Sequence, residues 1–153
     1  MQVNIKRIGD YVFYSNTNQF DTQGLYYGEW LLFFNHQHYQ YISQKCYEAV
    51  STGLVKWAKH TNPELVESTG HGLLAFKLES SDIQIINDKP VAPKHQALIQ
   101  WLLQNNMIPI NKSGKYNNIR FKVKTDGKGK HTGNAWNGFQ LSDFIDLTTG
   151  QPL

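Results

Sequence analysis

The sequence predicts an α+β fold built from antiparallel strands with helices gathered on one face. Strand-like and helix-like segments do not alternate one for one along the chain, which disfavours a doubly wound parallel sheet. Residues 118–125, NIRFKVKT, alternate strictly between apolar and polar or basic side chains, as in a strand with one buried face. With 153 residues, the chain has room for a single domain that spans residues 1–153.

The first half of the chain predicts two strands followed by a helix. Residues 11–14 form a short aromatic and β-branched run typical of a strand, and the polar stretch 15–24 is typical of a loop. The continuous apolar run 29–34 predicts a strand that is covered on both faces or nearly so. Apolar residues recur at helical spacing over residues 37–51, and Asn35 is placed to cap this helix.

The second half returns to strands and then to a helix. Residues 54–59 and 72–79 predict an antiparallel pair, with residues 60–71 as a polar loop between them. Pro93 suits the first turn of a second helix, whose apolar residues line one face. The alternating strand comes next, and a glycine-rich loop over residues 126–138 follows it.

The composition is that of a globular protein. Hydrophobic residues make up 40% of the chain and charged residues 18%, which excludes extended disorder as the main state. No apolar run approaches the roughly 18 residues of a membrane span, and the first residues lack the apolar core of a signal peptide. The single Cys46 fits a reducing compartment. We therefore expect a soluble, cytoplasmic protein with no membrane partner.

The net charge of +3 is unevenly distributed. Residues 112–131 carry seven basic side chains and one aspartate, a net charge of +6, so the rest of the chain has a net charge of −3. A local basic patch attracts phosphate groups, whereas an even charge of +3 would bear only on solubility. The seven basic residues are Lys112, Lys115, Arg120, Lys122, Lys124, Lys128 and Lys130.

Five of these residues are the predicted phosphate ligands. Arg120, Lys122 and Lys124 share one face of the alternating strand, and we expect that face to be the open side of the sheet. Lys128 and Lys130 follow in the glycine-rich loop, where backbone amides can approach an anion. The alternatives are a solvated edge strand and a flexible hairpin tip, and the sequence of a P-loop is absent.

Two tryptophans are candidates for stacking on a base. Trp57 stands between Lys56 and Lys59, and Trp136 lies in the glycine-rich loop. Exposed aromatic rings beside cations can stack bases while the cations hold phosphates. The other two tryptophans, Trp30 and Trp101, are expected in the core.

Two histidines offer an enzymatic alternative. His60 and His131 each lie in a Lys-His-Thr sequence, and two histidines with lysine neighbours can act as acid and base in phosphodiester cleavage. The His-x-Ser/Thr motif of two-histidine phosphoesterases is not met, because Asn62 and Gly133 occupy the third positions. No residues are spaced to complete a metal site, and no nucleophile motif occurs. No metal or cofactor is expected.

Four segments follow one another in an order that is informative: GEWLLFFN, LVKWAKHTNP, GLLAFKLE and IRFKVKTDGKGKHTGNAWNG. Between residues 28 and 138, this order resembles the translation initiation factor 4E-like superfamily, and in particular its members that are not cap-specific. The resemblance implies a curved sheet with helices on its convex side and a ligand site on its concave face. Cap-binding members hold a methylated guanine between two tryptophans, but Trp57 is followed by Ala58, so the base preference stays open.

These observations predict a binding protein for a phosphate-bearing ligand, either single-stranded RNA or a nucleotide, held on a basic sheet face and a glycine-rich loop. One alternative is a phosphodiester-cleaving enzyme that uses His60 and His131. A second alternative is a small inhibitor or adaptor whose exposed aromatic residues anchor a protein partner.

Overall fold

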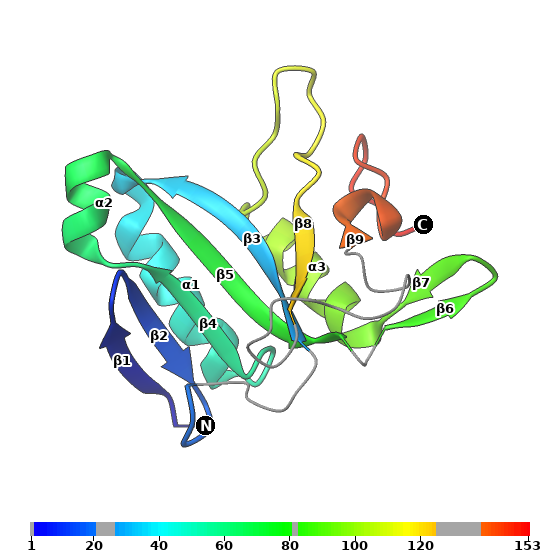
Figure 1. Cartoon of the computed structure of the whole chain (residues 1–153). Helices are drawn as coiled ribbons and strands as arrows, with labels where there is room; N and C mark the ends of the chain where they lie inside the picture. Colours follow the sequence, from blue (N-terminus) through cyan, green and yellow to red (C-terminus); the bar gives the residue numbers. More distant parts are fainter. Residues whose placement is uncertain (1, 21–26, 81–82, 125–138) are drawn as a thin grey trace. The chain divides into compact units, whose positions relative to one another are not determined.

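The computed structural model describes residues 2–20, 27–80, 83–124 and 139–153 (Figure 1). The chain forms two compact units, one of residues 1–23 and 31–78 and the other of residues 24–30 and 79–153. Strand β3 (Tyr27–Asn35) contributes to both units. The single domain expected from the chain length stays a prediction.

Antiparallel strands form the sheet of the first unit. β1 (Asn4–Ile8) pairs with β2 (Tyr11–Ser15), β2 pairs with β4 (Trp57–Thr61), and β4 pairs with β5 (His71–Glu79). The predicted strands at 11–14 and 72–79 and the antiparallel pairing of the 54–59 segment with 72–79 are confirmed, although β4 begins three residues later than expected. β1 was not predicted.

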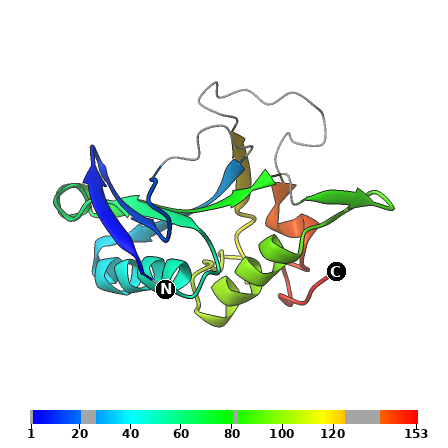
Figure 2. The same cartoon turned by 90° about the horizontal axis from the view of Figure 1, so that it is seen from below.

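Helix α1 (Tyr39–Ser51) packs against one face of these strands (Figure 2). Its buried side chains recur at helical spacing, and the Asn35 side chain accepts a hydrogen bond from the Gln37 amide in the 3-10 turn His36–His38 just before the helix. The helix predicted over 37–51 is therefore confirmed. The buried residues are Ile42, Cys46, Ala49 and Val50.

Helix α2 (Pro63–Thr69) occupies the segment that the sequence analysis assigned to a loop, so that assignment was wrong. The side chain of Asn62 accepts a hydrogen bond from the Leu65 amide, Pro63 fills the first turn, and Gly70 ends the helix with a φ of 83°. The helix has only seven residues, too few to show a clear apolar period. In the sequence, the capping residues Asn62, Pro63 and Gly70 were the features that indicated this helix.

The second unit is built around Trp30 of β3. This fully buried side chain donates a hydrogen bond to Nδ1 of His95, 3.1 Å away on helix α3 (Pro93–Gln104). His95 Nε2 lies 3.1 Å from the Glu79 carbonyl oxygen, to which it donates. The rings of Phe121 and Phe144 pack on Trp30. This core joins α3 to β3 and to β8 (Arg120–Lys124).

The remaining elements of the second unit are short. β9 (Phe139–Gln140) pairs with β8 and is followed by the 3-10 turn η4 (Leu141–Asp143). β6 (Gln84–Ile86) and β7 (Lys89–Val91) form a separate hairpin, which the sequence analysis did not predict. The hairpin turns at Asn87 and Asp88, both with positive φ.

The α+β class with a mainly antiparallel sheet is confirmed. In the described part of the chain, the main sheet has seven strands in the order β1-β2-β4-β5-β3-β8-β9. All the strand pairs whose register is described are antiparallel, and in each unit a long helix packs against one face of the strands.

A glycine in β3 provides a test of the second core. A Cβ atom at Gly28 would lie 2.5 Å from Cζ of Phe121 and 2.8 Å from the Lys122 carbonyl oxygen. We expect Gly28→Ala to lower the free energy of unfolding by about 1–3 kcal/mol, because β8 must shift to admit the methyl group. Urea unfolding measures this change, with the exposed Gln104→Ala as a control. Equal stability of the two variants would contradict the described packing.

Candidate functional site

The face of the first unit's sheet that points away from α1 carries a group of lysines and aromatic rings. Tyr14 of β2 contacts Ser43 of α1, and it lies against His60 of β4, so both side chains point to the helix side. Side chains alternate along a strand, which places their neighbours Phe13 and Lys59 on the opposite, open face.

Strand register brings five of these open-face residues together. Lys6 is paired with Phe13, and Phe13 is paired with Lys59. The Lys59 ammonium nitrogen lies 4.5 Å from the ring centroid of Tyr11 and 5.8 Å from that of Phe13. The Lys77 ammonium nitrogen lies 5.1 Å from the Phe13 centroid. We call Lys6, Tyr11, Phe13, Lys59 and Lys77 the lysine–aromatic cluster.

The cluster is positively charged, and its three lysines differ in exposure. Lys6 is exposed, Lys59 is half-buried, and Lys77 is only 7% exposed. No aspartate or glutamate occurs in β1, β2, β4 or residues 71–78 of β5. Aromatic faces stabilise nearby ammonium groups, most strongly where water is partly excluded. The arrangement creates a positive surface of the kind that attracts anions.

The sequence analysis did not single out this cluster, apart from noting Lys59 beside Trp57. Two signals were available: the alternation that puts Tyr11 and Phe13 on one face, and the lack of acidic residues in the first unit's strands. Which lysine meets which ring depends on the β2–β4 register, and that register is not evident in either strand alone.

The predicted basic face of β8 lies in the second unit. Phe121 is buried, whereas Arg120 and Lys122 are exposed on the other face, as the alternation predicted. Lys122 is paired across the strands with Glu29, which is buried, and Arg120 is paired with Gln140. A carboxylate beside Lys122 lowers the positive potential there, so Arg120 is the stronger anion contact of the two.

The structure says less about the other predicted site residues of β8 and of the glycine-rich loop. Lys124 belongs to β8 and is paired with Tyr27. The other four predicted site residues in the glycine-rich loop lie outside the described residues: Lys128, Lys130, His131 and Trp136.

Trp57, a candidate for stacking on a base, is buried in the structure. Its side chain is 5% exposed, and its indole nitrogen donates a hydrogen bond to the Gln19 carbonyl oxygen at 3.1 Å. The polar stretch after β2 thus supplies a backbone acceptor to the ring. The Lys56 ammonium group lies 5.8 Å from the ring centroid, but a largely buried ring offers little surface for stacking on a base.

His60, the other described candidate for catalysis, is fully buried. Its Nδ1 lies 2.8 Å from the Thr61 carbonyl oxygen and therefore donates, so Nε2 accepts a hydrogen bond from the Tyr14 hydroxyl at 2.8 Å. Tyr14 in turn accepts one from Ser43 at 3.0 Å. The edge of the Tyr39 ring packs against the imidazole. A fully buried and hydrogen-bonded imidazole presents no exposed surface to a substrate.

Burial shifts the pKa values of this network. It lowers the pKa of His60 and raises the pKa of Tyr14 to about 12, so both groups are uncharged at neutral pH. Burial likewise raises the pKa of the Cys46 thiol, so Cys46 is not a reactive nucleophile in the folded protein.

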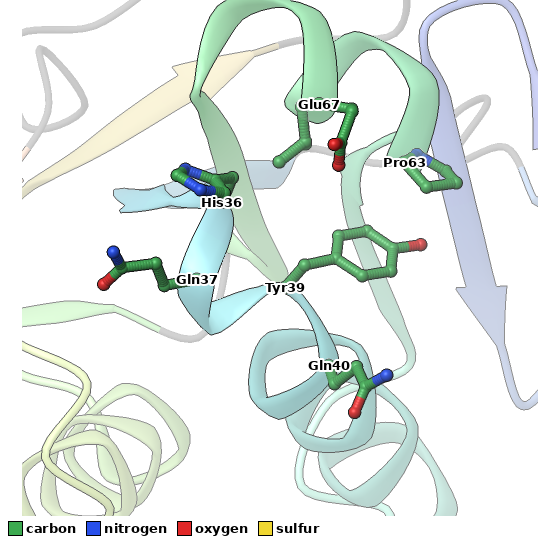
Figure 3. Close-up of a pocket in the computed structure, with 7 residues that line it drawn as sticks. His36, Gln37, Tyr39, Gln40, Pro63 and Glu67 are labelled. Atoms are coloured by element: carbon green, nitrogen blue, oxygen red, sulfur yellow. The ribbon is translucent and has the colours of Figure 1, made fainter.

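A pocket of about 310 Å³ lies between α2 and the beginning of α1 (Figure 3). His36 and Tyr39 line it from the turn before α1 and from the first residue of α1, and Glu67 lines it from α2. Burial raises the pKa of Tyr39. The pocket is lined by the Glu67 carboxylate and by the neutral amides of Gln37 and Gln40. This lining does not favour a ligand of one particular charge. Its lining residues are His36, Gln37, Tyr39, Gln40, Pro63, Val66 and Glu67.

Within the described ranges, no three histidine, cysteine or acidic side chains are grouped so that they could hold a metal ion. None of the described helices has the length and apolar character needed to cross a membrane.

No protein-family model, no curated protein and no solved structure matches the chain. The resemblance to the initiation factor 4E-like superfamily therefore stays a prediction.

The pKa of His60 predicts how stability depends on pH. The unfolded chain takes up a proton at His60 near pH 6.5, whereas the folded protein resists protonation there. The free energy of unfolding therefore falls as the pH is lowered below 6.5. We expect His60→Gln to reduce this slope, measured by urea unfolding between about pH 5 and pH 8. An exposed control, His71→Gln, should keep it. An unchanged slope in His60→Gln would contradict this assignment.

Proposed function

We propose that this protein binds a phosphate-bearing ligand, single-stranded RNA or a nucleotide, on the open face of its sheet. The observation that carries the proposal is the lysine–aromatic cluster, in which Lys59 and Lys77 lie near aromatic rings and Lys6 is paired with Phe13 across the strands. Lysines provide phosphate contacts, and a sheet face with aromatic residues is a common platform for unpaired bases.

Charge and exposure determine the role of each lysine. Lys6 and Lys59 are accessible enough to touch a phosphate, whereas the buried Lys77 contributes mainly through its positive field. The strands that carry these lysines, β1, β2, β4 and residues 71–78 of β5, contain no acidic residue. Such a surface favours a polyanion over a neutral ligand.

The sheet face is better suited to a single strand than to a duplex. A duplex presents its phosphates at the outside of a wide helix and keeps its bases stacked inside. A sheet face that offers both cations and aromatic surface is used more fully by a strand whose bases are free. We regard Arg120 and Lys122 as a separate set of phosphate contacts in the second unit.

The cluster lysines should govern both affinity and its dependence on salt. We expect Lys59→Gln and Lys6→Gln each to weaken binding of a labelled single strand and to reduce the slope of log affinity against log salt by about 1. Polarisation titrations at several salt concentrations measure both quantities. Lys45→Gln is the matched control, because Lys45 lies on α1 in an ion pair with Glu48. Unchanged slopes in both cluster variants would refute the proposed site.

A competition experiment distinguishes the two candidate ligands, a single strand and a nucleotide. If the natural ligand is a single strand, ATP should displace a bound strand only when the concentration of ATP phosphate groups far exceeds that of the strand's phosphate groups. Displacement by ATP at comparable concentrations would identify a nucleotide as the ligand.

The β8 face provides an independent test. We expect Arg120→Gln to reduce the salt slope more than Lys122→Gln does, because Glu29 is the cross-strand partner of Lys122. The same polarisation titrations measure the difference. Equal affinities for Arg120→Gln and the unaltered protein would contradict the assignment of Arg120 as a phosphate contact of the second unit.

A further inference from the structure

One aromatic side chain on the open face of the first unit is far more exposed than the rings of the cluster. Phe33 of β3 is 70% exposed, whereas its neighbours Leu32 and Phe34 are buried. Exposing a phenylalanine to this extent leaves a large apolar surface in water. The ring is therefore available to a ligand without any rearrangement of the protein.

The position of Phe33 follows from its neighbours on β5. The His36 amide donates a hydrogen bond to the Gly70 carbonyl oxygen, and the Phe34 ring lies against Gly72. In an antiparallel pair, these two contacts place Phe33 level with Leu73. Because Phe34 points to the helix side with Gly72, Phe33 points to the open face.

The same reasoning gives the separation of Phe33 from the cluster. Lys59 is paired with Ala75, so Leu73 lies level with Thr61. Phe33 is thus two strands from β4, and Lys59 is two residues along β4 from Thr61. With strands about 4.8 Å apart and a rise of about 3.4 Å per residue, the Cα atoms of Phe33 and Lys59 are roughly 12 Å apart. A strand of a few stacked nucleotides, at about 3.4 Å each, spans that separation.

The rings of Tyr11 and Phe13 are less available. Both are half-buried, and the ammonium groups of Lys59 and Lys77 lie within 6 Å of the Phe13 centroid. A base could stack on Phe13 only after displacing a cation that the ring stabilises. These rings therefore serve to position the lysines.

We infer that Phe33 is the residue on which a base of the ligand stacks, while Tyr11 and Phe13 hold the lysine ammonium groups in place for its phosphates. This inference rests on the proposed function and divides the open face into a base contact and a phosphate contact.

The experiment compares two ligands on the same variants. One ligand is a labelled oligouridine of roughly 12 nucleotides, and the other is the same sugar–phosphate strand without bases. The variants are Phe33→Leu, which keeps apolar bulk but removes the aromatic face, and Phe13→Leu. Tyr47→Leu is the matched control, because Tyr47 is an exposed aromatic residue of α1. Thermal unfolding of each variant checks that the fold is retained.

We expect Phe33→Leu to weaken binding of oligouridine at least about fivefold and to change the affinity for the baseless strand by less than about twofold. Phe13→Leu should weaken both ligands by the same factor, since it loosens the lysines that hold phosphates. Tyr47→Leu should change neither affinity.

Two results would overturn the inference while leaving the proposed function intact. One is an unchanged affinity of Phe33→Leu for oligouridine, and the other is an equal loss for both ligands in that variant. A loss confined to oligouridine in Phe13→Leu would assign the base to Phe13 instead. If the unaltered protein bound neither strand, the proposed function would fail and this inference with it.

Discussion

The antiparallel pairing of β2 with β4 is the constraint on which most of the first unit depends. It places Tyr14 beside His60 on the helix side and Phe13 beside Lys59 on the open side. A slip of one residue would exchange the two faces, burying lysines under α1 and exposing the Tyr14–His60 hydrogen bond. The buried polar network and the surface cluster are therefore two consequences of a single register.

Long apolar and alternating segments made much of the fold predictable. The strand at 118–125 and the helices at 37–51 and from Pro93 were recognised because burial of one face imposes a period on the sequence. β1 was missed because NIKRI mixes apolar and basic residues at an edge where little is buried. α2 was missed because its seven residues are defined by caps more than by an apolar stripe.

The site was harder to predict than the fold. The basic alternation of β8 could be read within one strand, and the structure leaves Arg120 and Lys122 exposed as expected. The lysine–aromatic cluster draws on four strands, so no single segment reveals it. Trp57 was misjudged because its neighbouring lysines suggested an exposed ring. The ring is instead covered and hydrogen-bonded by the backbone at Gln19, which lies 38 residues away in sequence.

The buried thiol of Cys46 has a practical consequence. It is the only cysteine of the chain and has no exposed surface, so a thiol reagent can reach it only after α1 separates from the sheet. The rate of labelling then reports the free energy of that opening, as amide hydrogen exchange does for backbone groups. The protein thus carries its own chemical reporter of local unfolding beneath the surface that we assign to its ligand.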